Sequence, residues 1–402
     1  MLMQNWLSSP LHFVEKGRLA GFFLCSLLCA CQPDWSAKTD TELFKAAATQ
    51  AAAATELAQR RLAQQQWAAA LKWQLQALQL GEHQLLAPYL HLLEQQQGFY
   101  AAAEFLSLWQ QAQQSQVEPS LLAQYGLWQG NSSVPGLQRS ECALQLQPVL
   151  QNAAAEQQWK RLLAEWQRDP AMSSLSVCFL PAQRIQSLEL RCSLASDTRV
   201  QCQYQHLASL VRHSAMTQLL VIGGKGGASY NNGILQLAED SSYSVLRHEF
   251  AHVLGFIDEY RLPESTAKDL CTRSDIPNLL TDLGELPLHQ RRFAHQRTVE
   301  QLVKVDTCAQ VGLQAYALAD WSLMRYHEAE LSPLYLHLMQ HQLKSAKALM
   351  PVQYFYAYKA RLAGDMTSWS VFMRKAAALG YPDAIRLLQQ SSKVQTDQPA
   401  PG

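Results

Sequence analysis

The chain has 402 residues, roughly two to three times the length of a typical domain, which predicts two to four structural units. Its 33 Lys and Arg residues balance 33 Asp and Glu residues, so the formal net charge is zero. This balance, with no block of like charges anywhere in the chain, argues against the concentrated basic surface on which nucleic-acid binding depends, and we expect no nucleic-acid partner. Hydrophobic residues make up 48% of the chain and charged residues 16%, which excludes a disordered protein.

The first thirty residues have the features of a secretory signal. Lys16 and Arg18 form a basic flank, and the apolar run of residues 19–28 has about half the length needed to cross a bilayer. Residues 28–31 (LCAC) then resemble the bacterial lipobox, whose last cysteine is lipidated and becomes the new N-terminus. We therefore expect a lipoprotein signal peptide over residues 1–30, with an uncleaved signal anchor as the alternative.

Cleavage of that signal would leave a lipidated Cys31 at the membrane surface, followed by a linker over residues 31–40. Gln32 follows Cys31, where some bacterial lipoproteins carry the Asp that retains them at the inner membrane. These features predict a lipid-anchored protein of the bacterial cell envelope, on the outer membrane and facing the periplasm. In the alternative interpretation, Cys31 is only an apolar residue of the signal.

Six cysteines remain after the signal and Cys31 are set aside, an even number that is typical of disulfide-bonded envelope proteins. No two of them form a CxxC motif, which excludes zinc ribbons and thioredoxin-like centres. Cys192 and Cys202 flank a turn-like stretch and are expected to pair across a hairpin. Six cysteines allow about fifteen pairings, and free thiols are the alternative. The pairs that we expect are Cys192–Cys202, Cys271–Cys308 and Cys142–Cys178.

Residues 41–170 are rich in Ala, Leu and Gln and poor in Gly, Pro and β-branched residues, which favours helix. Trp67 and Tyr100 are each followed by three alanines, and these two stretches begin 33 residues apart. Gly81 and Gly98 are placed to break helices. This pattern resembles tetratricopeptide repeats. We expect a helical, tetratricopeptide-like region that could bind a protein partner, with an irregular helical bundle as the alternative.

The amino-acid composition changes after residue 170, from helix-favouring to strand-favouring residues. Short β-prone runs at residues 175–180, 188–194, 199–204 and 218–222 are separated by Pro, Ser, Asp and Gly. A mixed α/β unit is therefore expected over residues 171–331. The chain as a whole is predicted to be α+β, with one mixed-sheet domain between mostly α-helical, repeat-like regions.

Residues 245–260 read VLRHEFAHVLGFIDEY. His248 and His252 are four residues apart, so on a helix both imidazoles emerge from one face and can bind one metal ion at about 2.0–2.1 Å. Glu249 follows the first histidine and is placed to hold and deprotonate a metal-bound water, the general-base role of HExxH peptidases. The motif predicts a catalytic Zn²⁺ site.

The residues after this motif favour a particular third ligand. Gly255 comes three residues after His252, where it can end a helix because Gly accepts the left-handed backbone. The chain can then turn back and offer Asp258 to the metal. The alternative is a thermolysin-like arrangement in which Glu264 or Glu285 is the third ligand, but the position of Gly255 argues against it.

A second motif lies far downstream. Residues 322–326 (SLMRY) fit the S-x-M-x-Y Met-turn, and residues 248–258 fit the pattern HExxHxxGxxD. Together they resemble the metzincin zinc peptidases, among which this chain is similar to the smaller set with an Asp ligand. The ending DEY at residues 258–260 and the Gly-rich stretch upstream are also similar to the IgA-peptidase-like metallopeptidases.

The resemblance implies a metzincin-like zinc peptidase domain. Met324 would form an apolar floor beneath the metal, and Tyr326 would bind the resting metal or stabilise the oxyanion of the intermediate. Ordinary core packing is the alternative for both residues. A strand at residues 234–238 would form the upper edge of the cleft, where an extended peptide can add to the sheet; a flexible loop is the alternative.

The chain becomes helical again over residues 332–390. Residues 375–384 (KAAALGYPDA) resemble the second half of a Sel1-like repeat. Such repeats bind partners, but a single copy is expected to pack against the domain before it. The polar, Pro-bearing residues 391–402 predict a disordered tail.

These features together predict a zinc endopeptidase that acts on protein or peptide substrates and is tethered to an envelope membrane through Cys31. Glu249 and Tyr326 are the expected catalytic residues, and His248, His252 and Asp258 the expected zinc ligands. The alternative is a catalytically silent helical-repeat scaffold lipoprotein. The complete set of motif residues favours an active enzyme.

Overall fold

The computed structural model describes residues 33–113, 117–130 and 133–396. The predicted signal peptide, Cys31 and residues 397–402 of the predicted tail lie outside the described residues. Helix accounts for about 53% of the structure and strand for about 11%, which confirms an α+β protein. The chain divides into two compact units, residues 1–83 and 84–402. Within the described part, no helix is both long and apolar enough to cross a membrane.

The first unit consists of helices in the part that is described. They are η1 (Trp35–Ala37), α1 (Asp40–Ala46), α2 (Ala51–Ala63) and α3 (Trp67–Gln79). Thr39 and Glu42 form a capping box at the start of α1. Arg60 of α2 donates to Asp40 Oδ1 at 2.9 Å and to Ser36 O at 2.9 Å. Residues 35–40 are therefore folded against α2, and the prediction of a linker through residue 40 is wrong for them.

Helices also open the second unit: α4 (Leu86–Gln97), α5 (Phe99–Gln113) and α6 (Pro119–Gln124), with η2 (His83–Leu85) before them. The two helices predicted from their aromatic and alanine pattern are present. One begins at Trp67, and the other begins at Phe99, one residue before Tyr100. Gly98 adopts a φ of +91° and ends α4, as predicted. The tetratricopeptide-like repeat itself stays a prediction.

A mixed sheet lies at the centre of the second unit, with the strand order β2-β1-β4-β6-β5, and β3 pairs with the end of β1. All neighbours on this path are parallel except β5, which runs antiparallel to β6 at the edge. Asn232 and Gly233, with φ of 51° and 83°, form the tight turn between β5 and β6. The strands are β1 (Leu144–Leu150), β2 (Val177–Phe179), β3 (Gln183–Arg184), β4 (Gln218–Ile222), β5 (Ser229–Asn231) and β6 (Ile234–Leu237).

This order corrects two predictions. The edge strand is β5, so the prediction of an edge strand at residues 234–238 is wrong: β6 lies between β4 and β5. The prediction of helix through residue 170 is wrong for β1, which lies between β2 and β4. Leu146 of β1 packs into the core on one face of the sheet and Val149 into the core on the other. The sheet domain therefore begins before residue 171.

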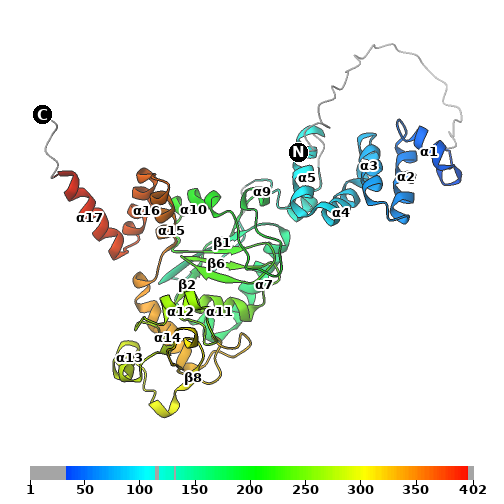
Figure 1. Ribbon diagram of the computed structural model, residues 1–402. Helices are drawn as coiled ribbons and strands as arrows, with labels where there is room; N and C mark the ends of the chain where they lie inside the picture. The colour runs from blue at the N-terminus through cyan, green and yellow to red at the C-terminus, as the bar shows by residue number, and fades with distance from the viewer. Residues whose placement is uncertain (1–32, 114–116, 131–132, 397–402) are drawn as a thin grey trace. The chain divides into compact units, whose positions relative to one another are not determined.

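Helices cover both faces of the sheet (Figure 1). Side chains alternate along β4, so that Leu220 and Ile222 pack into the core on the first face, whereas Leu219 and Val221 pack into the core on the second. The helices of the first face are α7 (Ala153–Arg168), α8 (Pro170–Ser173), α11 (Tyr243–Val253) and α14 (Pro333–Lys344). Those of the second face are α9 (Ser187–Leu190), α10 (Ala208–His213), α15 (Val352–Leu362), α16 (Met366–Ala378) and α17 (Pro382–Thr396).

The C-terminal helices belong to this domain. Tyr335 and Leu338 of α14 are fully buried in the core of the first face, so the predicted boundary at residue 332 is not a domain boundary. Val352 of α15 and Phe372 of α16 pack on the second face. These helices thus pack against the preceding domain, as expected, whereas the resemblance to a Sel1-like repeat stays a prediction. Because α17 continues to Thr396, the predicted tail is wrong for residues 391–396.

A small lobe follows α11. It contains a three-stranded antiparallel sheet of order β7-β9-β8 and its own apolar core, which includes Ile257 and Val305. The short helix η7 (Ala346–Ala348) lies between α14 and α15. The elements of the lobe are α12 (Glu264–Leu270), β7 (Leu279–Leu280), η4 (Leu283–Glu285), α13 (Leu286–Phe293), η5 (Val299–Gln301), β8 (Val303–Val305), η6 (Ala309–Val311) and β9 (Ala315–Ala317).

Three disulfides join the six cysteines of the described residues, and all three predicted pairs are confirmed: Cys142–Cys178, Cys192–Cys202 and Cys271–Cys308. The second closes a hairpin-like loop in which Ser193 N donates to Gln201 O at 2.8 Å. The flanking runs at residues 188–194 and 199–204 form no strand, which corrects the prediction for both. α9 takes up the start of the first run, and η3 (Tyr204–Leu207) begins at the end of the second.

Candidate metal centre

The helix α11 begins and ends at residues suited to those positions. The side chain of Ser242 caps the start by accepting a hydrogen bond from Val245 N at 3.3 Å. At the other end, Gly255 adopts a φ of +85°, and Phe256 N donates to Ala251 O at 3.1 Å. The chain turns back after Gly255 and brings Asp258 toward His248 and His252, as the position of Gly255 predicted.

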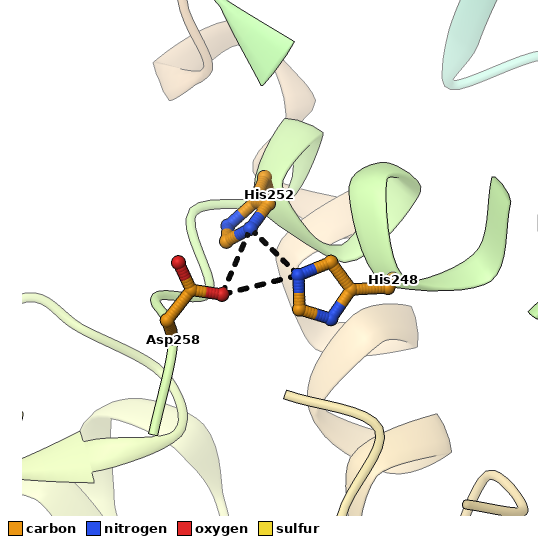
Figure 2. Close-up of side chains that lie close together, drawn as sticks. All are labelled: His248, His252 and Asp258. Carbon is orange, nitrogen blue, oxygen red and sulfur yellow. Dashed lines mark hydrogen bonds and ion pairs between the residues drawn. The ribbon is translucent and has the colours of Figure 1, made fainter. Parts of the chain in front are cut away.

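Three side-chain atoms converge at the end of this helix (Figure 2). Asp258 Oδ1 lies 3.1 Å from His248 Nε2 and 3.3 Å from His252 Nε2, and the two Nε2 atoms are 3.2 Å apart. Among the described residues, this is the one group of three or more potential metal ligands. The structure therefore brings together the three residues that the sequence predicts as ligands.

Backbone carbonyls orient both imidazole rings. His248 Nδ1 donates to Leu323 O at 2.8 Å, and His252 Nδ1 donates to Phe256 O at 2.9 Å. A carbonyl oxygen can only accept, so Nδ1 carries the hydrogen in each neutral ring and Nε2 keeps its lone pair. This arrangement presents the lone pair of each Nε2 toward the other two candidate ligands, as a metal site requires.

The electrostatics of the group favour a cation among its members. Burial alone would raise the pKa of Asp258, but the two neighbouring histidines hold it well below its usual range. Burial alone would lower the pKa of His252, yet the Asp258 carboxylate raises it. Asp258 Oδ1 is buried without a hydrogen-bond partner that would satisfy it. A positive ion between the three atoms would satisfy all of them.

Glu249 lies next to the three candidate ligands but is not part of their group. Its side chain is 8% exposed, and its Oε2 is buried without a hydrogen-bond partner. Burial raises the pKa of this carboxyl, an effect that the neighbouring histidines oppose. A carboxylate with an unsatisfied oxygen beside a metal centre can accept a proton from a bound water.

Glu259 holds the loop that carries Asp258. It is 1% exposed and accepts hydrogen bonds from Asn278 Nδ2 at 2.8 Å, from Ser322 Oγ and from Tyr335 OH. Its own backbone N donates to Met324 O at 3.0 Å. Burial raises the pKa of Glu259, and the three hydrogen bonds oppose this shift. The network joins the loop to the predicted Met-turn, through Ser322 and Met324, and to α14, through Tyr335.

Replacing Glu259 by Ala would remove the acceptor of three buried donors, of which Asn278 Nδ2 alone keeps a second acceptor, Ile257 O. We expect the free energy of unfolding to fall by about 3 kcal/mol or more, because each unsatisfied buried polar group costs about 1–3 kcal/mol. Urea unfolding of the metal-free protein measures this loss. As a control, Glu264→Ala removes an exposed carboxylate that pairs only with exposed Lys268, and it should change stability by less than about 1 kcal/mol. Equal losses for both variants would contradict this role of Glu259.

The predicted Met-turn lies against α11, although about 70 residues separate the two motifs. Met324 is fully buried, and the neighbouring Leu323 supplies the carbonyl that orients His248. The ring of His327 is half-buried, and its centre lies 4.3 Å from that of the His248 ring. The Tyr326 ring stacks on Trp321 at 4.3 Å and is 36% exposed, and its catalytic role stays a prediction.

Two further residues, Tyr260 and Arg199, lie at the site, and the sequence patterns did not identify either as functional. The phenol of Tyr260 lies beside Asp258; burial and then the carboxylate raise its pKa. Arg199 is an exposed cation whose charge lowers the pKa of both Glu249 and Tyr260. The ending DEY was a signal for Tyr260, whereas Arg199 comes from a loop 50 residues before the motif, and no local pattern marks it.

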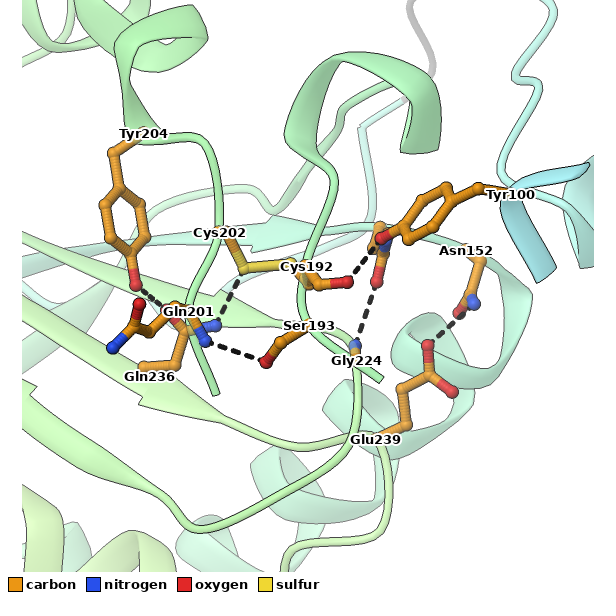
Figure 3. The surroundings of a disulfide bond; sticks show 11 residues. Tyr100, Asn152, Cys192, Ser193, Gln201, Cys202, Tyr204, Gly224, Gln236 and Glu239 are labelled. Atoms are coloured by element: carbon orange, nitrogen blue, oxygen red, sulfur yellow. Dashed lines mark hydrogen bonds between the residues drawn. A yellow bond between two sulfur atoms is a disulfide. The ribbon is translucent and has the colours of Figure 1, made fainter. Parts of the chain in front are cut away.

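The Cys192–Cys202 disulfide closes the loop that carries Arg199 (Figure 3). Tyr100 of α5 donates its hydroxyl to Cys192 O at 2.5 Å, and Gln236 Nε2 of β6 lies 2.9 Å from Cys202 Sγ. Beyond the disulfide, Val200 N donates to Gly227 O at 2.9 Å, just before the edge strand. The disulfide, α5 and the sheet thus hold this loop beside the site.

A pair of buried histidines lies in the small lobe. Arg297 N donates to His295 Nδ1 at 3.2 Å, so the other nitrogen of His295 carries the hydrogen and donates to His289 Nδ1 at 2.7 Å. His289 Nε2 in turn donates to Ile276 O at 2.9 Å. Both rings are neutral in this chain of hydrogen bonds, and a proton on His295 Nδ1 would break it. Burial, followed by the nearby His289, lowers the pKa of His295 to about 4.

This pair predicts a loss of stability in mild acid. The unfolded chain takes up a proton near the ordinary histidine pKa of about 6.5, whereas folded His295 resists it until about pH 4. The free energy of unfolding should therefore fall as the pH falls from about 6.5 to about 4. Urea midpoints across this range should fall less in His295→Asn than in the parent. The control is His206→Asn, which removes an exposed histidine; an identical slope in the parent and His295→Asn would contradict the prediction.

Comparisons with known proteins found no match: no model of a protein family, no curated protein and no solved structure matches this chain. The interpretation of the site thus depends on its own residues and their geometry.

Proposed function

We propose that the protein is a zinc-dependent endopeptidase whose metal ligands are His248, His252 and Asp258. The observation that carries this proposal is the convergence of two imidazole nitrogens and one carboxylate oxygen, 3.1–3.3 Å from one another. Ligand atoms bound at about 2.0–2.1 Å to one tetrahedral zinc ion are about 3.3–3.4 Å apart, close to these distances. Two neutral imidazoles and one carboxylate are also a donor set of catalytic zinc, with a position left for water.

Zn²⁺ at this site would supply a Lewis acid that polarises the scissile carbonyl and lowers the pKa of water. Glu249 would take the proton from the attacking water and pass it to the leaving amine. Its buried, unpaired Oε2 supports that role. Arg199 contributes a positive charge that favours the ionised form of Glu249 before the proton is taken.

The chain's own edge strand supports an extended peptide as the substrate. β5 is the last strand of the sheet on its path and packs near α11, which carries both histidines. A peptide can pair with such an edge by backbone hydrogen bonds. The antiparallel edge strand, the buried Met324 and the Asp258 ligand also support the narrower proposal of a metzincin-like domain, similar to the IgA-peptidase-like enzymes.

The site of action that we propose is the bacterial cell envelope. Three disulfides support an oxidising compartment such as the periplasm. The proposed anchor is a lipid on Cys31, which would hold the enzyme at the outer membrane facing the periplasm. Helices α1 to α5 would then be available to a protein partner.

The alternative function is that of a scaffold without catalytic activity, and the large fraction of helix in the chain favours it. Metal analysis separates the two. The zinc-loaded protein should contain one zinc per chain and cleave members of a broad peptide library, and a chelator should abolish cleavage. Protein that binds no zinc and leaves every peptide intact would contradict the proposal and favour the scaffold.

A further inference from the structure

A cavity of about 490 Å³ opens beside the candidate metal centre. His252 forms part of its wall, together with Tyr230 of the edge strand β5. Its volume lies in the range of about 300–1,000 Å³ that is typical of ligand sites. A peptide that pairs with β5 and has its scissile bond at the metal centre would therefore place a neighbouring side chain at the mouth of this cavity.

The charges that line the cavity do not cancel. Arg273 donates from Nε and Nη2 to the two carboxylate oxygens of Asp275, at 2.9 and 3.0 Å, so these two charges neutralise each other. Arg292 donates from Nη1 to Ser274 O at 2.7 Å, and it forms no ion pair with a carboxylate in the part of the chain that the structure describes. The cavity therefore keeps one positive charge from Arg292.

Much of the remaining lining is apolar. Phe293, Leu349 and Met350 supply this apolar surface. His341 also lines the cavity, and its ring lies 6.0 Å from that of Phe293. A group that suits this lining and the charge of Arg292 has an aliphatic stem and an anionic end that can accept hydrogen bonds.

We propose that the cavity selects a substrate carboxylate, held by Arg292. This inference rests on the proposed peptidase function and adds a substrate class to it. The carboxylate could belong to an acidic side chain next to the scissile bond or to the C-terminus of a short peptide. A guanidinium group recognises either by charge-assisted, two-point hydrogen bonding, whereas a lysine side chain would be repelled.

Matched peptides test this proposal on the zinc-loaded full chain. One peptide taken from the library digest is made with Glu, Gln or Lys beside the scissile bond and with an amidated C-terminus; a Gln peptide that ends in a free acid just after that position is the fourth substrate. We expect kcat/KM to be about tenfold or more higher for Glu than for Gln. A higher value for the free-acid peptide alone would identify the terminal carboxylate as the source.

Two variants show whether Arg292 is responsible. Arg292→Gln should bring the Glu-to-Gln ratio close to one. Arg291→Gln removes the same charge from the neighbouring exposed residue, which does not line the cavity, and should keep the ratio of the parent. The binding of labelled Glu and Gln peptides to the zinc-loaded Glu249→Gln variant, measured by fluorescence anisotropy, should show the same preference without turnover.

The outcomes distinguish this inference from the function on which it rests. Cleavage with equal kcat/KM for the Glu, Gln and free-acid peptides would overturn the inference and leave the peptidase function intact. A Glu preference that survives in Arg292→Gln would also overturn it. Failure to cleave any peptide, with no peptide bound by the Glu249→Gln variant, would overturn both.

Discussion

Glu249→Gln should retain one zinc per chain and lose almost all peptide cleavage. Glu249 contributes none of the three converging atoms, which belong to His248, His252 and Asp258, so its replacement leaves the proposed metal centre intact. The amide cannot accept the proton of the attacking water. General-base catalysis contributes a factor of about 10² to 10⁴, and kcat/KM should fall by that factor. Zinc content is measured by elemental analysis and kcat/KM with a fluorogenic peptide from the library digest.

The variant is well suited to this test because the substitution disturbs little else. Glu249 Oε2 has no hydrogen-bond partner, so an amide nitrogen at that position breaks no bond there. The urea midpoint of the metal-free variant should therefore be close to that of the parent. A variant that cleaves peptides as fast as the parent would contradict the general-base role. Loss of the zinc would instead place Glu249 among the ligands.

Asp258→Asn should weaken zinc binding by more than about 100-fold. Residues that only support metal ligands change the affinity by about 10- to 100-fold when they are replaced, and a direct ligand should count for more. The substitution keeps the shape of the side chain and removes the negative charge that balances the ion. A competition titration against a chromophoric chelator measures the dissociation constant. Zinc should also raise the melting temperature of the parent far more than that of the variant.

Glu264→Gln is the matched control for this experiment. Glu264 is the alternative third ligand suggested by the thermolysin-like arrangement, yet its carboxylate lies 2.6 Å from Lys268 Nζ and is 61% exposed. Its replacement should leave the zinc affinity unchanged. A large loss in Glu264→Gln together with a small loss in Asp258→Asn would exchange the two assignments and contradict the site described above.

The sequence predicted the features that local patterns specify. Histidines four residues apart on a helix must share a face, and a glycine after the second histidine must permit a reversal of the chain. The α11 helix and its end at Gly255 follow directly from this. Among the disulfides, Cys192–Cys202 follows from a local pattern, a turn-like stretch between cysteines 10 positions apart, whereas the other two pairs span 36 and 37 positions and no local pattern specifies them.

The features that the sequence did not predict depend on distant contacts. β1 contains three glutamines or prolines among its seven residues, LQLQPVL, and follows a long helical stretch. Its strand conformation comes from pairing with β2 and β4, both later in the chain. The network around Glu259 likewise joins Asn278, Ser322 and Tyr335, which no spacing in the sequence connects.

Diffraction data collected at the zinc absorption edge would test the central claim most directly. Crystals of the mature chain grown with zinc should show one strong anomalous peak about 2.0–2.2 Å from His248 Nε2, His252 Nε2 and a carboxylate oxygen of Asp258. Met324 should lie beneath this ion without binding it. An Asp258 side chain turned into solvent, with no anomalous peak between the two histidines, would contradict the account.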